Sequence, residues 1–411
     1  MKTMIITSLV LLFVDALAFV PVAPSRTHAM TCRLQMEMAS HGGDDARSSS
    51  SSEDSAISVV DVVMKKHALT NRRSALQFAV GAVSASPMLF NIPSATAAAP
   101  PAKTAFPTWT LDGNVKFPTL ALNTVGLSAD ETVYAMELAT PLGFTHIDFH
   151  PGKERDGVAS YLKNHPEKRK DLFLNTKIRK PKPGTRAEDA AKLAMAQIDE
   201  DFSILGVDYV DMLMLRDSPD CDVMQAQWAV MEDALAKGRT RSIGVINYCE
   251  GSLKCILETA NVKPALNYYM VHVGIQNPTA KSLRNYCDKK GIKTFGYGAV
   301  GEPGPNQEIL ENDMLEKIGQ NHGKTPAEVA LRWVIQGGAA VSVRPTTEFG
   351  LGFGKCTEEN GCQESLKQRA DVLSWKLTKG EMSQLNALTA PDDNPTLFSS
   401  AGCPNSFVMP K

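Results

Sequence analysis

Four side chains in this sequence combine charge with proton chemistry, and each follows an apolar segment. They are Asp148, His150, Lys177 and Arg216. An Asp and a Lys at neighbouring strand ends are able to pair, and histidine titrates near neutral pH. Arginine stays charged and transfers no proton, but its planar guanidinium binds an oxyanion or a carboxylate. These groups are suited either to polarising a carbonyl or to binding an anion.

The segments that would position these groups alternate between short apolar strands and amphipathic helices from Pro118 onward. The predicted strands are residues 118–125, 145–150, 172–179, 209–216, 242–248, 265–273, 293–300 and 339–346, and residues 190–205 are the clearest helix. Eight such units predict an α/β fold, a closed (β/α)8 TIM barrel, with its chemistry at the C-terminal strand ends. A doubly wound open sheet is the alternative, but no Gly-x-Gly-x-x-Gly turn follows the first strand.

Several motifs, in this order and spacing, resemble the aldo-keto reductases. Gly-Phe-Thr-His-Ile-Asp at residues 143–148 is similar to the second strand of that family, and Leu-Asp-Gly at 111–113 to its N-terminal hairpin. Residues 205–211 resemble the entry to the fourth strand, residues 228–244 the helix and strand that follow, and residues 315–333 are the most literal match. The resemblance covers nearly all of the predicted barrel and implies that fold.

The resemblance also implies a reaction, in which hydride moves from a nicotinamide to a carbonyl while a Tyr, assisted by a Lys–Asp pair, protonates the oxygen. Asp148 and Lys177 match the Asp and the Lys. The Tyr position falls on Lys153, or on Gly152 if one residue is deleted, and Arg216 stands where the family has a substrate-orienting His. His150 is the candidate replacement acid, with Lys153 as a second candidate and an inert loop histidine as the alternative.

The cofactor surface implied by the resemblance is that of NADPH. Asn247 matches the residue that binds the carboxamide, and Tyr297 the aromatic ring on which the nicotinamide stacks. Tyr268 aligns with a Gln of the sixth strand, and Arg344 with a Lys that reaches the adenosine phosphate. The family's other contacts are altered, since Ile246, Met270, Pro345 and Ser365 replace its Ser, Glu, Ser and Arg. A glycine-rich segment at 349–354 is read as a lid or tied loop rather than a phosphate loop.

Two functional interpretations follow. In the first, the chain is an NADP-linked oxidoreductase that acts on a small carbonyl compound with an altered proton donor. In the second, it is a non-catalytic barrel that binds an anion or docks a protein partner in its compartment. The near-neutral balance of 43 basic and 45 acidic residues argues against nucleic-acid binding.

The first 97 residues are interpreted as targeting signals. Residues 1–18 have the pattern of a secretory signal peptide, and Phe19 after it resembles the bipartite plastid signals of algae with secondary plastids. Residues 19–70 are transit-like and include a low-complexity, Ser-rich stretch. Residues 71–97 resemble a twin-arginine signal, with a membrane anchor as the alternative. Together they predict delivery of residues 98–411, a barrel with a C-terminal tail and no membrane span, to the thylakoid lumen.

Seven cysteines follow these segments. Cys356 and Cys362 flank a short loop that is able to close as a disulfide, and free thiols are the alternative because spacing alone does not fix pairing. No Cys and His cluster has the spacing of a zinc site, so no metal is predicted.

Overall fold

Eight parallel strands close into a barrel in the order β10-β3-β4-β5-β6-β7-β8-β9. They are β3 (Leu120–Asn123), β4 (His146–Asp148), β5 (Phe173–Ile178), β6 (Met212–Arg216), β7 (Ile243–Ile246), β8 (Leu266–Met270), β9 (Lys293–Tyr297) and β10 (Ala340–Val343). Each lies within its predicted range, so the predicted barrel is confirmed. The computed structural model describes residues 106–275, 278–301, 306–346 and 355–388. The predicted targeting segments, the glycine-rich segment 349–354 and the C-terminal tail lie outside these residues.

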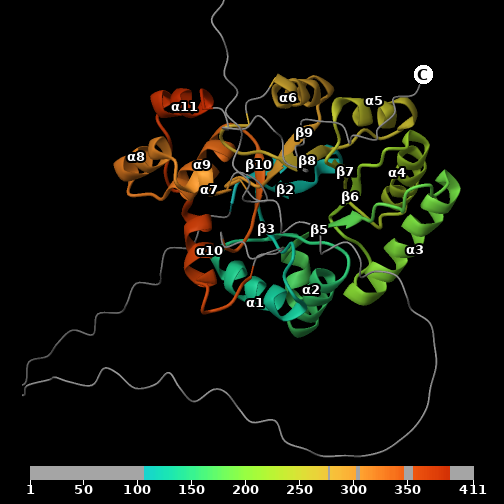
Figure 1. Cartoon of the computed structure of the whole chain (residues 1–411). Coiled ribbons are helices and arrows are strands. Elements are labelled where there is room, and N and C mark those ends of the chain that lie inside the picture. Colours follow the sequence, from blue (N-terminus) through green and yellow to red (C-terminus); the bar gives the residue numbers. More distant parts are fainter. Residues whose placement is uncertain (1–105, 276–277, 302–305, 347–354, 389–411) are drawn as a thin grey trace, which may run out of the picture. The chain divides into compact units, whose positions relative to one another are not determined.

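Helices form a ring outside the strands (Figure 1). They are α1 (Ala129–Ala139), α2 (Lys153–Asn164), α3 (Ala187–Leu205), α4 (Cys221–Ala236), α5 (Glu250–Thr259), α6 (Pro278–Lys290), α7 (Asn306–Leu310), α8 (Asp313–His322), α9 (Pro326–Gln336), α10 (Cys362–Asp371) and α11 (Lys379–Asn386). Short 3-10 turns are η1 (Asp112–Asn114), η2 (Thr140–Leu142) and η3 (Pro166–Asp171). The predicted helix at 190–205 is α3, which begins three residues earlier.

Local sequence signals set where several helices begin. Ser128, Thr325 and Thr378 each form a capping box with the Glu three residues later, which satisfies backbone N–H groups of the first turn. Asp220 caps α4 through the backbone N–H groups of the next turn. Gly157 lets α2 approach α1 closely, because a Cβ there would lie 2.5 Å from the backbone oxygen of Ala129. These caps fix where the loops leave the strand ends.

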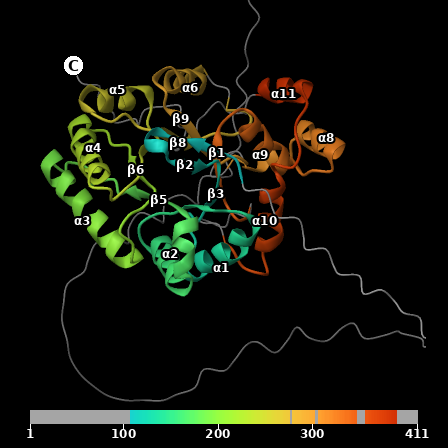
Figure 2. The same cartoon turned by 180° about the vertical axis from the view of Figure 1, so that it is seen from behind.

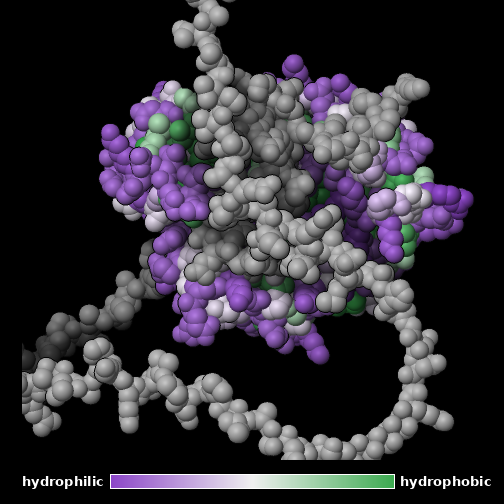
Figure 3. Space-filling model, in the orientation of Figure 1, coloured by the Kyte–Doolittle hydropathy of each residue, from purple (hydrophilic) through white to green (hydrophobic). Residues whose placement is uncertain are grey.

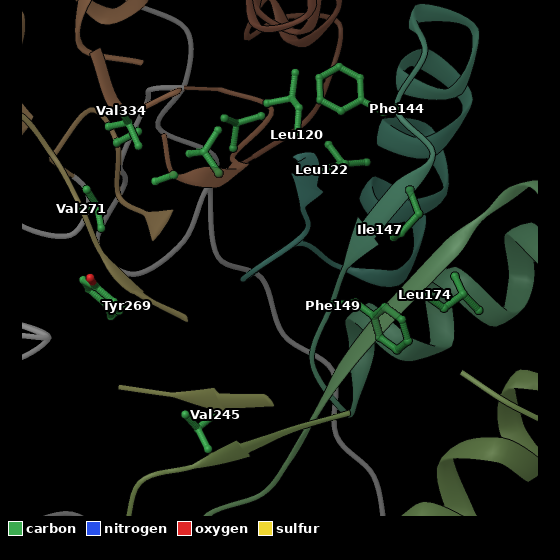
Figure 4. Close-up of a cluster of buried hydrophobic side chains, with 14 of the residues drawn as sticks. Leu120, Leu122, Phe144, Ile147, Phe149, Leu174, Val245, Tyr269, Val271 and Val334 are labelled. Atoms are coloured by element: carbon green, nitrogen blue, oxygen red, sulfur yellow. The ribbon is translucent and has the colours of Figure 1, made fainter. Parts of the chain in front are cut away.

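Alternation along the strands separates two cores. Leu122, Ile147, Leu174 and Val245 point outward and pack against the surrounding helices, and Figure 4 shows this cluster. The intervening residues point into the barrel, because successive strand side chains face opposite sides. Because of this alternation, Asp148 and every second residue of the neighbouring strands point toward the barrel axis.

The bottom of the barrel is filled by aromatic side chains and closed by a hairpin. Strands β1 (Thr108–Thr110) and β2 (Lys116–Pro118) pair antiparallel and form the hairpin that the sequence predicted (Figure 2). Phe117 from β2 inserts between His146, Phe173 and Phe295, with ring centroids 4.8, 5.2 and 5.3 Å away. The barrel is therefore a packed core and not a pore, and only its C-terminal end is available for chemistry.

Two disulfides lie within the described part of the chain. Cys356–Cys362 joins the residues that the sequence singled out, and Cys221–Cys255 joins the start of α4 to α5 across 34 residues. The second bond was not predicted, because it depends on the packing of α4 against α5. Cys249 is also disulfide-bonded, whereas Cys287 is a buried free thiol.

The outer surface is mostly hydrophilic on the face shown in Figure 3, with small apolar spots among the described residues. In the described ranges the large exposed apolar side chains are Leu193, Met195 and Ile204, which are separate positions on α3. Within the described ranges, no helix combines the length and the apolar character needed to cross a membrane.

Candidate active site

The centre of the site is a buried ion pair between Lys177 at the end of β5 and Asp148 at the end of β4. Both side chains are fully buried, and the Lys177 ammonium donates to Oδ1 of Asp148. It also donates to the backbone oxygen of Phe149 at 2.9 Å. The structure thus brings together the two residues that match the resemblance. A buried pair is strongly coupled, since removing either charge leaves the other uncompensated.

Asp148 accepts hydrogen bonds from four side chains. Besides Lys177, Oδ1 accepts from Asn175 at 3.0 Å, while Oδ2 accepts from the Tyr268 hydroxyl at 2.6 Å and from Ser342 at 2.7 Å. Burial alone would raise the pKa of Asp148, but the charge of Lys177 and these donors outweigh it and lower the pKa. The carboxylate is therefore ionised and fixed in place.

Tyr268 lies in this network rather than at the barrel mouth. It is 2% exposed, and its hydroxyl also accepts from Asn123 at 3.1 Å. The resemblance had placed it on the cofactor surface in the position of a Gln, but a phenol reaches farther than that Gln and extends across the interior. Burial, and then the charge of Asp148, raise its pKa well above the ordinary value. Tyr268 therefore has neither the exposure nor the acidity of a proton donor.

Neither candidate for the missing Tyr position places an acid at the ion pair. Gly152 caps α2 with φ +110°, and Lys153, the first residue of that helix, is exposed. Lys153, the second candidate acid, therefore lies on the surface and not beside Lys177 and Arg216. The connection from β4 to α2 is short, and its one titratable group at the barrel mouth is His150.

His150 is paired with a carboxylate that the sequence reading did not single out. Its Nδ1 lies 2.8 Å from Oε2 of Glu154, the residue four positions later in α2. Glu154 is held by the backbone N–H of His150 and by that of Gly126, each at 2.8 Å, and by Thr124 at 3.4 Å. A carboxylate at Nδ1 fixes the proton there and leaves Nε2 as the reacting nitrogen. The spacing His-x-x-x-Glu was the available signal.

The protonation of His150 depends on its surroundings. Burial lowers its pKa, the nearby charges of Lys177 and Arg216 lower it further, and Glu154 opposes them. The side chain is 17% exposed, so its ring remains accessible to solvent protons. His150 is therefore mostly neutral at neutral pH and gains charge as the medium becomes acidic.

Arg216 ends β6, next to the strand that carries Lys177, and is half-buried. Its guanidinium forms no ion pair or side-chain hydrogen bond with any residue that the structure describes. The adjacent carboxylate, Asp217, lies 3.7 Å from Lys180 instead. Arg216 is thus a cation at the barrel mouth whose charge acts on both His150 and Lys177.

The residues expected at the nicotinamide lie together on the other side of the mouth. Tyr297, at the end of β9, donates to Oδ1 of Asn247 at 2.8 Å. Asn247 follows β7 with φ +61°, a left-handed conformation that non-glycine residues adopt rarely and mostly at functional positions. The tyrosine hydroxyl thus fixes the orientation of the Asn247 amide.

A second arginine joins Arg344 at the expected phosphate end. Arg344 and Arg369 line one pocket with the backbone of residues 298–300. Arg369 lies on α10, one helical turn after Ser365, to which the sequence comparison had assigned the family's phosphate-binding Arg. A cation thus reaches this pocket from a position that the helix geometry, and not the sequence alignment, brings beside Arg344. The two arginines and the Asn247–Tyr297 pair lie at the strand ends and helix where the resemblance puts the two ends of the cofactor.

Comparison with known proteins finds relatives that share this fold. The model of the aldo/keto reductase family matches residues 117–348, which is more than half of the chain. A glyoxal reductase of Bacillus subtilis is 25% identical over 280 residues (68% of this chain, 91% of the relative), and a morphine 6-dehydrogenase of Pseudomonas putida is 27% identical over 293 residues (68% and 90%). An aldo/keto reductase structure from Brucella melitensis superposes with a TM-score of 0.57 at 24% identity, covering 69% of this chain and 99% of that one. A Gox0644 mutant in complex with NADPH gives 0.59 at 22% identity (71% and 96%).

Proposed function

The chain belongs to the aldo/keto reductase family, and we propose that it is an NADPH-linked carbonyl reductase in which His150 replaces tyrosine as proton donor. The observation that carries the proposal is the juxtaposition of two pairs at the barrel mouth. The Lys177–Asp148 pair is retained, and the His150–Glu154 pair lies where the tyrosine is missing. An imidazole whose second nitrogen is held by a carboxylate is a common general acid.

The cofactor would be held at two ends. Asn247 and Tyr297 would contact the nicotinamide, and Arg344 with Arg369 would contact the adenosine phosphate. When bound, the cofactor supplies the hydride that reduces the carbonyl carbon. The chain's own groups supply everything else, namely the orientation of the carbonyl, the stabilisation of charge on its oxygen, and the proton.

Different residues stabilise the charge on the carbonyl oxygen and supply its proton. Lys177 and Arg216 stabilise the negative charge that develops on this oxygen, and their effect is strong because the site is partly buried. Protonated His150 then donates from Nε2, while Glu154 stabilises the imidazolium through Nδ1. Solvent returns the proton to His150 through its exposed edge.

The test compares the full-length protein with two histidine variants. His150→Gln removes the acid, whereas His165→Gln removes a histidine that pairs with Glu137 on the surface. NADPH binding is measured by calorimetry, and carbonyl reduction by NADPH absorbance. We expect both variants to bind NADPH like the wild type, and only His150→Gln to lose activity, by about 10²–10⁴-fold. Equal activity of the two variants would contradict the role of His150.

A non-catalytic, anion-binding barrel is the second candidate function. It is favoured by the four hydrogen bonds that hold Asp148, since this network is complete without a substrate and without a tyrosine in the segment after β4. Calorimetry separates the two functions. The absence of heat at millimolar NADPH would remove the reductase proposal, and the binding of anions alone would support the second.

We also propose that the protein functions in an oxidising compartment, the thylakoid lumen that the N-terminal signals predict. The disulfides Cys221–Cys255 and Cys356–Cys362 support this, because such bonds persist outside reducing compartments. Thiol labelling of the protein taken from isolated plastids provides the test. Full labelling of these cysteines before reduction would contradict an oxidising location.

A further inference from the structure

We propose that the substrate of this site is a 2-oxo acid, and that Arg216 binds the carboxylate next to its reacting carbonyl. The inference rests on the proposed reductase function and adds the chemical class of the substrate. It also gives a role to a residue that stands where the family has histidine.

The first observation is the absence of a partner for Arg216 among the described residues. Other arginines of low exposure have polar partners: Arg155 contacts Asp201 at 2.7 Å and Arg169 contacts Asp211 at 3.1 Å. Arg332, which pairs with no carboxylate in the described ranges, donates to Gln336 at 3.0 Å. A half-buried guanidinium without a counter-charge is unfavourable, because partial burial weakens its hydration. The Arg216 side chain is therefore available to bind an anionic ligand.

The second observation is the charge balance at the mouth. Lys177 is neutralised by Asp148, His150 faces Glu154, and Asp217 is paired with Lys180. Arg344 lies at the end of β10, which is opposite β6 in the barrel order, beside the proposed phosphate pocket. Among the residues that the structure describes, one positive charge thus remains near the reacting groups, that of Arg216, and it matches a substrate with a single negative charge.

The third observation is the position of Arg216 relative to the acid and the lysine. Strands β5 and β6 are neighbours in register, with Lys177 opposite Met214, and neighbouring strands lie about 4.8 Å apart. In a 2-oxo acid one carbon–carbon bond separates the carbonyl from the carboxylate. The carboxylate can thus face Arg216 while the carbonyl faces His150, and the fully buried Lys177 acts through its charge and not by contact. The carbon gains a hydride, the oxygen gains a proton, and the carboxylate is unchanged.

The experiment uses the full-length protein with pyruvate and methyl pyruvate, which share a ketone and differ in the negative charge. Oxamate, which resembles pyruvate but is not reduced, reports binding by calorimetry. The variants are Arg216→Gln, Arg216→Lys and, as a control, Arg186→Gln, which removes a charge from an arginine 71% exposed on the surface. Thermal melting verifies that each variant is folded.

We expect the wild type to prefer pyruvate over methyl pyruvate in kcat/KM. Arg216→Gln should reduce this preference about 10- to 100-fold and weaken oxamate binding similarly, because a charge-assisted bidentate contact is lost. Arg216→Lys should restore part of both, and Arg186→Gln should change neither. Equal use of both ketones by the wild type, or a preference that survives in Arg216→Gln, would overturn the inference and leave the reductase function standing. Arg216-dependent oxamate binding without carbonyl reduction would refute the reductase function and leave the carboxylate site standing.

Discussion

The hydroxyl of Tyr268 donates to Asp148 at 2.6 Å across the full width of the barrel. The two residues come from β8 and β4, which are separated by three strands in either direction around the closed sheet. The phenol stacks on Phe295 with a ring-centroid separation of 4.4 Å and so lies flat over the aromatic layer beneath it. This tyrosine therefore joins opposite walls of the barrel and supports the Lys177–Asp148 ion pair.

Tyr268→Phe should destabilise the protein by about 1–3 kcal/mol. It removes a donor from a buried carboxylate and leaves Asn123 without its acceptor. Tyr269→Phe is a matched control, because Tyr269 lies on the other face of the same strand and bonds only the neutral hydroxyl of Thr294 at 3.1 Å. Urea unfolding provides the measurement. Equal losses in the two variants would show that the charge of Asp148 does not strengthen the Tyr268 bond.

Lys177→Met should cost about 3–5 kcal/mol, because it leaves the Asp148 carboxylate buried without its counter-charge. Adding Asp148→Asn should recover part of this loss, since the double variant buries no charge. Lys254→Met, which breaks a surface pair with Glu250, should cost less than about 1 kcal/mol. Chemical denaturation of all three variants gives these values, and a double variant no more stable than Lys177→Met would contradict the uncompensated-charge explanation.

Carbonyl reduction should accelerate as the pH falls below neutrality. Burial and the charges of Lys177 and Arg216 lower the pKa of His150, so more of the acid form is present at lower pH. Glu154→Gln should displace this rise to still lower pH, because the glutamate raises the pKa of His150. The measurement is kcat/KM between pH 5 and 8. A wild-type profile that is flat, or identical to that of His150→Gln, would exclude His150 as the donor.

The stability of the fold should also decrease with acidity because of His146. This ring packs against Phe173 at 4.7 Å, and burial lowers its pKa from 6.5 to about 4. Between these pH values the unfolded chain binds the proton and the folded chain does not. The stabilisation is therefore complete above pH 6.5 and falls by up to about 3 kcal/mol toward pH 4. His146→Phe should flatten the dependence in urea unfolding at pH 7.5, 6 and 5, and an unchanged slope would contradict this assignment.

The two disulfides should differ in their contribution to stability. The bond Cys221–Cys255 closes a loop of 34 residues, and Cys356–Cys362 closes one of 6. Loop-closure entropy predicts stabilisations of about 4 and 2 kcal/mol, respectively. Paired Cys→Ala variants at each bond, unfolded in denaturant without reductant, measure both. A larger loss at Cys356–Cys362 would show that chain entropy does not dominate.

The secondary structure was predictable because its signals are local. Consecutive residues determine the alternation of apolar side chains and the end of each strand. The caps at Ser128 and Thr325 likewise involve residues only three positions apart. The same alternation places Asp148 and Lys177 on the inner face of adjacent strands. They are able to pair because β4 and β5 lie side by side, with Asp148 opposite Asn175. The prediction of the barrel and of the central ion pair therefore needed little information about contacts between distant segments.

The remainder of the site depended on how the barrel closes. Sequence alone did not show that Tyr268 crosses to Asp148, because no local pattern records which strands face each other across a closed sheet. Arg369 and the Cys221–Cys255 bond were missed for a similar reason, since each depends on the packing of a helix against its neighbour. The sequence by itself determined the strands and the residues at their ends. The tertiary structure decided which of those residues meet, because side-chain contacts between distant segments are set by barrel closure and helix packing.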